Sequence, residues 1–248
     1  MSLKDYLKDI TTYVSSTGFF DKIKITATDK DITVEAMESK DKEVILKGKF
    51  LKPLSDLDGE FGLTNLSLIQ TICNDPEFSS KDSTATVVYE TRNNEQIPTE
   101  IAYKNKSKSH INYRFMSKNL IPDMPKFLEP KWDVIIKPNK ANVSQFAWVS
   151  NGLSAYEEYF TPKIANGELK FFIGEESAAS QRGGTVFASD LTETFDSPHK
   201  WKIQQVLGTL KLADTCDCEM AFSIKGAIQI TLNTGVGVYK YIFPAKVK

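Results

Sequence analysis

An order of helical and strand-like segments that occurs twice constrains the fold of this chain most strongly. Each half begins with a helical segment, continues through strands to a second short helix, and ends in further strands. Three pairs of positions in corresponding segments are each 137 residues apart: Tyr6 and Val143, Ile32 and Leu169, and Leu66 and Ile203. Any two α+β halves can be roughly aligned, but a shared offset at three places favours a duplicated domain.

The first half has clear helix and strand signals. Ser2 is a good N-cap with Asp5 three residues later, and Gly18 is a natural stop, so a helix is predicted between them. A second helix is predicted at residues 63–75, because Pro76 cannot continue it. Strands are predicted at residues 22–27, 31–37, 42–51, 84–91, 97–103 and 110–115.

The second half gives the same signals in the same order. A helix is predicted at residues 142–152, with Asn142 as its cap and Gly152 as its stop. A short amphipathic helix is predicted at residues 202–212. Strands are predicted at residues 131–137, 168–174, 184–195, 219–225, 227–233 and 237–243.

The order of these segments predicts the fold class. Helices and strands do not alternate strictly, so parallel β-α-β units are not expected. The sequence predicts an α+β protein with two similar domains, each with two helices packed on antiparallel sheets. We place the domains at residues 1–118 and 131–248, joined by a connector at 119–130 that is apolar yet rich in proline.

The chain has no recognisable catalytic or metal-binding pattern. His110 and His199 are the only histidines and lie in different halves, and neither is near a nucleophile motif. Cys216 and Cys218 lack the further ligands that a zinc site needs. We therefore expect no enzyme, cofactor or metal, and favour a binding or scaffolding role. The charged N-terminus and the lack of a long apolar run lead us to expect an intracellular, cytoplasmic protein.

The chain has 31 basic and 32 acidic residues, so its positive and negative charges almost cancel. This argues against a protein that grips nucleic acid through a uniformly positive surface. Lysines on or beside the predicted helices could still form a sparse basic surface for phosphates; the alternative is an ordinary solvated helix face. The candidate residues are Lys4, Lys8, Lys140, Lys200, Lys202 and Lys211.

Four stretches in this order resemble the DNA sliding clamps of T-even-type tailed bacteriophages, which are related in fold to eukaryotic and archaeal clamps. They are LTNLSLIQTICND (63–75), KANVSQFAWVSNGL (140–153), VLGTLKL (206–212) and YKYIFPAK (239–246). The resemblance covers nearly the whole chain and rests on order and spacing. It implies a DNA-clamp fold in a closed homotrimeric ring, with helices inside around duplex DNA and sheets outside.

The resemblance also implies the partners of such a ring. These are duplex DNA, bound without sequence preference, a replicative DNA polymerase and a clamp loader ATPase, in the cytoplasm of an infected bacterium. The lysines above would face DNA. Phage relatives carry basic residues where this chain has Trp148 and Asn151, so Lys140 is the one residue that we assign to DNA on that helix. A ring-forming structural protein of the virion is the alternative.

A groove for a partner peptide is also implied by the resemblance. In clamps it lies beneath the connector and beside the last strand. Here its predicted residues are Leu120, Ile121, Met124, Phe127, Tyr241, Ile242, Phe243 and Pro244.

Overall fold

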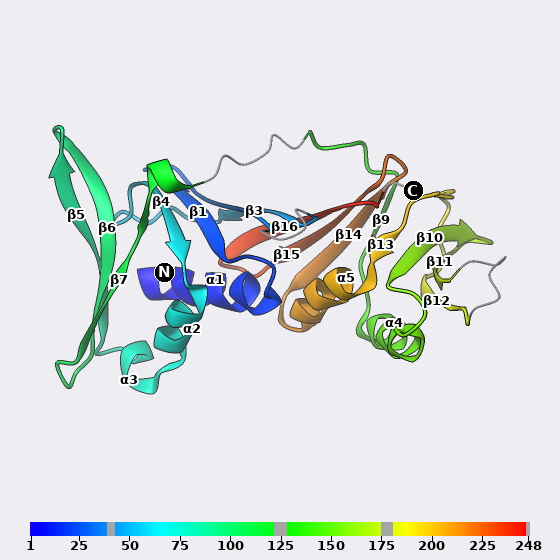
Figure 1. Cartoon of the computed structure of the whole chain (residues 1–248), viewed down its shortest axis with the longest axis horizontal. Helices are drawn as coiled ribbons and strands as arrows, with labels where there is room; N and C mark the ends of the chain where they lie inside the picture. The colour runs from blue at the N-terminus through cyan, green and yellow to red at the C-terminus, as the bar shows by residue number, and fades with distance from the viewer. Residues whose placement is uncertain (39–42, 122–127, 175–180, 247–248) are drawn as a thin grey trace. The chain divides into compact units, whose positions relative to one another are not determined.

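The computed structural model describes residues 1–38, 43–121, 128–174 and 181–246 (Figure 1). The chain divides into two compact units. Unit 1 comprises Met1–Lys126 and Asn233–Tyr239, and unit 2 comprises Phe127–Leu232 and Lys240–Lys248. The division falls within the connector predicted at 119–130, and a short segment near the C-terminus belongs to unit 1.

Local capping residues set the two ends of the first helical region of unit 1. Helix α1 (Leu3–Tyr13) begins with a capping box between Ser2 and Asp5, as predicted. A 3-10 turn (Ser15–Thr17) follows, and Gly18 ends it in the left-handed region, at φ 70°.

The second helical region of unit 1 is shorter than predicted. Helix α2 (Leu66–Asn74) is followed directly by α3 (Pro76–Ser79), with proline at the first position of the new helix. The predicted start at residue 63 is wrong, because Leu63 is a buried residue of strand β4 (Gly59–Thr64).

Two antiparallel sheets form the rest of unit 1. The first has the order β8-β4-β1-β2-β3, and buried residues alternate with more exposed ones along β1, β2 and β3. The second has the order β5-β6-β7. The bounds not yet given are β1 Lys22–Ala27, β2 Ile32–Met37, β3 Ile45–Phe50, β5 Thr84–Arg92, β6 Glu95–Lys104, β7 His110–Arg114, β8 Met116–Ser117 and 3-10 helix η2 Lys118–Leu120.

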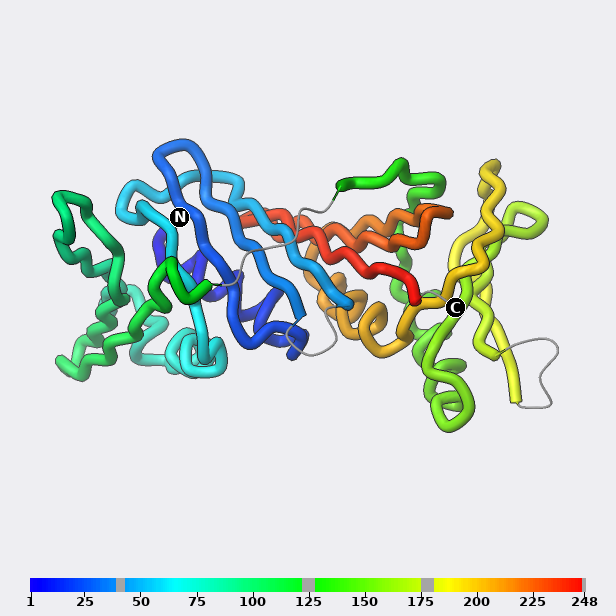
Figure 2. The backbone as a smooth tube through the Cα atoms, turned by 45° about the horizontal axis from the view of Figure 1, so that its top comes forward, coloured from blue at the N-terminus to red at the C-terminus, as the bar shows by residue number. Residues whose placement is uncertain are grey.

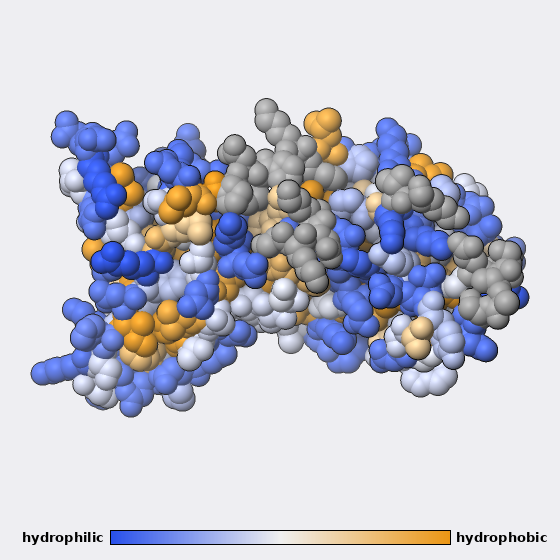
Figure 3. Space-filling view, viewed as in Figure 1, coloured by the Kyte–Doolittle hydropathy of each residue, from blue (hydrophilic) through white to orange (hydrophobic). Residues whose placement is uncertain are grey.

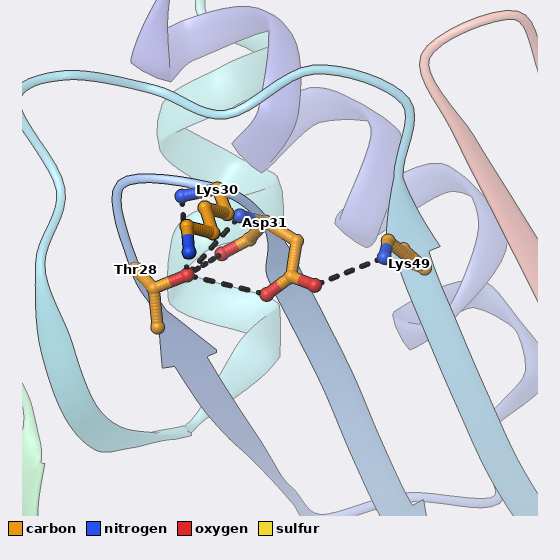
Figure 4. Close-up of polar contacts among 4 residues, drawn as sticks. All are labelled: Thr28, Lys30, Asp31 and Lys49. Atoms are coloured by element: carbon orange, nitrogen blue, oxygen red, sulfur yellow. Dashed lines mark hydrogen bonds and ion pairs between the residues drawn. The ribbon is translucent and has the colours of Figure 1, made fainter.

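Side-chain hydrogen bonds fix the turn between β1 and β2 (Figure 4). The Thr28 hydroxyl oxygen accepts from the backbone N–H groups of Lys30, at 3.3 Å, and Asp31, at 3.1 Å. The carboxylate of Asp31 lies 2.9 Å from the Lys49 ammonium on β3. The turn is thereby tied to the third strand of the sheet, and the hydrogen bond from Lys49 lowers the pKa of Asp31.

Unit 2 contains α4 (Lys140–Leu153), α5 (Ile203–Leu210) and antiparallel strands. One sheet has the order β12-β11-β10-β13, and β14 lies between β9 and β15 (Figure 2). Strand β16 pairs with β15, and its residues up to Tyr239 belong to unit 1. The strand bounds are β9 Val134–Ile136, β10 Tyr159–Ala165, β11 Glu168–Ile173, β12 Gly183–Ala188, β13 Trp201–Lys202, β14 Asp217–Ser223, β15 Ala227–Asn233 and β16 Gly237–Pro244, and the 3-10 helix η3 is Lys211–Thr215.

The core of unit 2 is an aromatic cluster beneath α4. The ring of Phe146 lies 5.1 Å from Phe160, 4.9 Å from Phe171 and 6.0 Å from Phe187, measured between ring centroids. All four side chains are buried. The cap of α4 is Asn139 and not Asn142 as predicted: the Asn139 side chain accepts the N–H of Asn142 at 2.8 Å.

The two units repeat one order of elements. In unit 1 it is α1, β1, β2, β3, β4, α2, and in unit 2 it is α4, β10, β11, β12, β13, α5. The strand orders β4-β1-β2-β3 and β13-β10-β11-β12 correspond as well. The helix starts Leu3 and Lys140, like the strand starts Lys22 and Tyr159, are 137 residues apart. The α+β class with antiparallel sheets is confirmed.

Candidate nucleic-acid interface

The four longer helices expose few acidic groups. Helices α2 and α5 contain no charged residue, and the one charged residue of α4 is Lys140. Helix α1 has two acidic residues, and both make internal hydrogen bonds. Apart from the exposed Asp5 at the start of α1, these helix surfaces therefore present cations and neutral polar groups, in a chain with 32 acidic residues in all.

The carboxylates of Asp5 and Asp9 both accept hydrogen bonds within unit 1. The carboxylate of Asp5 accepts the backbone N–H of Ser2 at 2.7 Å, and this hydrogen bond lowers its pKa. Asp9 is buried, and its carboxylate accepts the hydroxyl of Tyr239 at 2.7 Å and that of Thr234 at 3.1 Å. Burial raises the pKa of Asp9. Asp9 thus joins α1 to the turn before β16.

Lys4 is a structural residue. Its ammonium group donates to the carbonyl oxygen of Ser80 at 2.6 Å, and to the carbonyl and hydroxyl oxygens of Ser83 at 2.9 and 2.8 Å. These three acceptors match the three N–H donors of a lysine. The predicted role of Lys4 in facing DNA therefore disagrees with its geometry, because the side chain holds the loop after α3.

Lys8 and Lys81 are two exposed cations near Lys4. Together with Lys4 they line a hollow of about 460 Å³ between α1, α2 and the loop after α3. Burial raises the pKa of Cys73 in this hollow to about 11, so the thiol is neutral at pH 7. Sequence reasoning missed Lys81, because it considered lysines on and beside helices but not the polar loop in which Lys81 lies.

Lys140 and Lys211 lie on the helix side of unit 2. Lys140 is the first residue of α4, and its ammonium nitrogen is 3.2 Å from a carboxylate oxygen of Asp214. Lys211 directly follows α5 and is exposed. The ion pair is solvent-exposed at both residues, so it contributes little to stability. Both lysines are accessible to an anionic partner.

Lys202 lies at the start of α5, where it lines a hollow of about 330 Å³ with Ser150 of α4. The hydroxyl of Ser150 is buried and has no hydrogen-bond partner in the described chain. Glu157 and Glu158 line the same hollow. The site is therefore mixed in charge, and we do not assign it to phosphate.

The prediction for Lys200 disagrees with the structure. Trp201 points into the core, where its indole N–H donates to the carbonyl of Phe243 at 3.0 Å. Neighbouring residues of an extended chain point to opposite faces. Lys200 accordingly lines a hollow with Tyr159 and Thr161, on the sheet face opposite the buried Phe160 that contacts Phe146 of α4. Lys200 thus lies on the side of the sheet away from α4.

Trp148 is the largest exposed group on these helices. Its side chain is 73% exposed on α4, and Asn151, one turn further along the helix, is exposed as well. These are the two positions where the sequence lacks the basic residues expected from its resemblance.

The residues predicted for a peptide groove differ in exposure. Leu120 is 69% exposed, and Ile121 is half-buried beside Gly62. Tyr241, Ile242 and Phe243 are buried in unit 2, so their side chains offer almost no surface, whereas Pro244 is exposed. Met124 and Phe127 lie outside the described residues. The groove stays a prediction.

Two further classes of site were searched for within the described residues. In these ranges no three His, Cys, Asp or Glu side chains come together as a metal site. Among the same residues, no helix has the length and apolar character needed to cross a membrane.

Comparison with known proteins gives a clear result for the fold. No protein-family model matches the sequence, and no curated protein matches it significantly. Solved structures match over the whole chain. The PCNA of A. fulgidus, solved with the C-terminal region of FEN-1 bound, has a TM-score of 0.71 at 9% identity, covering 100% of this chain and 97% of that one.

Two other structures agree with this match. PCNA of Thermococcus kodakaraensis has a TM-score of 0.66 at 12% identity and covers 99% of this chain and 98% of its own. Proliferating cellular nuclear antigen of Entamoeba histolytica has a TM-score of 0.65 at 12% identity, with 98% and 96% covered. The chain has the fold of a DNA sliding clamp.

Proposed function

We propose that this protein is a DNA sliding clamp, a homotrimeric ring that encircles duplex DNA and holds replication proteins on it. One observation carries the proposal beyond the fold: α1, α2, α4 and α5 expose lysines and neutral polar groups and a single acid, Asp5, while Asp9 is buried in unit 1. A wall of such helices would tolerate a passing phosphate backbone. On this proposal the protein is a non-enzymatic processivity factor in the cytoplasm of a phage-infected bacterium.

The sparse charge of the helices suits sliding. Each phosphate that a lysine neutralises adds to affinity and releases a counterion, so many tight contacts would hold the protein at one place. A ring is held by its topology and needs few such contacts. Lys8, Lys81, Lys140 and Lys211 would supply these contacts.

Edge strands offer a way to close the ring. β7 is the last strand of its sheet in unit 1, and β12 is the outermost described strand of its sheet in unit 2. An edge strand has unpaired backbone groups that can pair with another chain. Pairing β7 of one copy with β12 of the next would be a head-to-tail contact, which closes into a ring of three when the rotation between copies is one third of a full turn.

Partner proteins would be held through apolar anchors near the connector. Leu120 and Leu128 are 69% and 88% exposed. Exposed leucines at these positions would bind a short apolar peptide from a replicative polymerase or a clamp loader ATPase. The side chains of Tyr241, Ile242 and Phe243 are buried and would not touch the peptide.

Primer extension on a long single-primed template tests the proposal. With its polymerase and loader present, and a trap for released polymerase, the protein should lengthen the product of each binding event several-fold. Leu120→Ala should remove much of this effect, with Leu51→Ala, also exposed, as the matched control. Light scattering should give three times the 27.9 kDa of one chain. A monomer that does not change product length would refute the proposal.

A further inference from the structure

One face of α4 carries an unusual set of exposed side chains, here named the α4 stripe. Its members recur at helical spacing and are all exposed: Ala141, Ser144, Gln145, Trp148, Asn151 and Gly152. Phe146, on the opposite side of the helix, is fully buried in the aromatic cluster. The α4 stripe is therefore the outward face of a helix that is firmly packed from behind.

Trp148 stands in the middle of this stripe. Tryptophan is highly buried on average, and Trp201 of the same unit is 1% exposed, against 73% for Trp148. The residues around Trp148 on the stripe are small or of modest size. A Cβ added at Gly152 would meet no described atom within 4 Å, so the stripe is open there to a flat ligand.

The chemistry of the stripe favours nucleic acid over protein. Ser144, Gln145 and Asn151 offer hydroxyl and amide groups, which hydrogen-bond to base edges and phosphates. Helix α4 has no carboxylate to repel phosphates, and Lys140 at its start is positive. A contiguous apolar patch, which marks many protein-docking sites, is absent from the stripe, whose one large apolar side chain is Trp148. Figure 3 shows a mostly pale surface over α4, of intermediate hydropathy.

We propose that the α4 stripe binds unpaired bases of single-stranded DNA, with the indole of Trp148 stacked on a base. Stacking does not depend on sequence, because every base has an aromatic face. This inference rests on the proposed clamp function: a clamp acts where duplex meets single strand, and a stripe with Lys140 beside it as the one lysine of α4 would hold the unpaired strand without strong phosphate contacts.

Fluorescence titration with oligo(dT) tests this proposal on the intact protein. Trp148 is the most exposed of the three tryptophans, so oligo(dT) should quench the emission of the wild type. In Trp148→Ala this quenching should be lost, and binding, followed by the anisotropy of labelled oligo(dT), should weaken about tenfold. Trp148→Phe should bind within about threefold of the wild type, because it keeps an aromatic face.

The controls separate this inference from the clamp proposal. Tyr156→Ala removes another exposed aromatic side chain just beyond α4 and should bind oligo(dT) normally. Duplex retention should be the same in Trp148→Ala and wild type. Unchanged oligo(dT) binding in Trp148→Ala, or an equal loss in Tyr156→Ala, would overturn the inference while leaving the clamp intact. A changed oligomeric mass in Trp148→Ala would also overturn it, by showing a contact between copies. Failure of duplex retention in every variant would count against the clamp alone.

Discussion

Units 1 and 2 share one order of elements but differ in the chemistry of their helix surfaces. In unit 1, the ammonium group of Lys4 donates hydrogen bonds to Ser80 and Ser83. Lys8 and Lys81 are exposed cations nearby. In unit 2, α4 exposes Trp148 between small and amide-bearing residues. The repeat therefore fixes where helices lie, while the side chains they expose are set separately in each unit.

The interiors of the two units differ as well. Beneath α4, unit 2 relies on phenylalanine rings in mutual contact. Beneath α1, unit 1 contains a buried carboxylate, Asp9, held by Tyr239 and Thr234. An apolar cluster is stabilised by burial at any pH, whereas a buried carboxyl group makes stability depend on pH. The same architecture thus gives two units that should respond differently to perturbation.

The largest effect is expected from opening the aromatic cluster of unit 2. Phe146→Ala removes a fully buried ring and should lower the free energy of unfolding by about 3–5 kcal/mol, because a cavity remains. Denaturant titration would measure the loss. Trp148→Ala, on the same helix, should cost far less, since that side chain is 73% exposed. Equal losses would contradict the described packing of α4.

A smaller effect is expected from the part-buried contacts of Lys4 in unit 1. Lys4→Met keeps most of the length of the side chain but removes three N–H donors from the oxygens of Ser80 and Ser83, which should cost about 1–3 kcal/mol. Hydrogen exchange should rise in the loop at residues 80–83. Lys8→Met, one turn along the same helix and exposed, should leave both stability and exchange unchanged. If Lys4→Met changed neither the free energy of unfolding nor the hydrogen exchange, the structural role of Lys4 would be contradicted.

Two carboxyl groups of unit 1, those of Asp9 and Asp31, should make the free energy of unfolding depend on pH in opposite directions. The pKa of Asp9 is raised by burial, so its favourable contribution is complete below its ordinary value of 3.8 and is lost as pH rises through the folded pKa. Asp9→Asn should therefore gain stability relative to wild type as pH rises from below 3.8.

Asp31 provides the opposite case and the control. The pKa of Asp31 is lowered by the hydrogen bond from Lys49, so its contribution is present above 3.8 and is lost as pH falls through the folded pKa. Asp31→Asn should thus lose stability relative to wild type as pH rises. Unfolding curves at several pH values would measure both differences. The same sign for both variants would contradict the assignment of Asp9 as the buried group.

The smallest effects are expected in the salt dependence of duplex binding. Removal of one phosphate contact, by Lys8→Ala or Lys81→Ala, should lower the slope of log affinity against log salt by about 1. Lys200→Ala should leave the slope unchanged, because Lys200 lies on the sheet face away from α4. A reduced slope in Lys200→Ala would place DNA on the other face of the unit.

Much of the fold was predictable where local signals agree with tertiary structure. The strands at Lys22–Ala27 and Ala227–Asn233 have the predicted bounds, because apolar residues and turn signals coincide there. The cap at Ser2 was found for the same reason. Strand β10 was not predicted; it contains Pro162, which lacks an N–H, and β13 pairs with β10 only at Tyr159 and Phe160.

The candidate site was less predictable, because exposure depends on packing between distant segments. Lys4 and Lys8 look alike in the sequence, and only the loop at Ser80–Ser83 separates their roles. Lys200 was assigned to the helix side because the two-residue strand β13, which directs its side chain, has no sequence signal. Tyr241, Ile242 and Phe243 do not show the alternation of apolar and polar residues that is typical of a half-exposed strand. All three are in fact buried.

Retention on DNA with blocked ends tests the central claim, encirclement of duplex, most directly. The protein at high concentration is allowed to thread onto linear duplex with one blocked end, and the second end is then blocked. A wash at about 1 M salt removes proteins held by charge alone, because such contacts are screened. We predict that the protein survives this wash and is released when the DNA is cut by a restriction enzyme. Loss in the wash, or retention after cutting, would contradict the account.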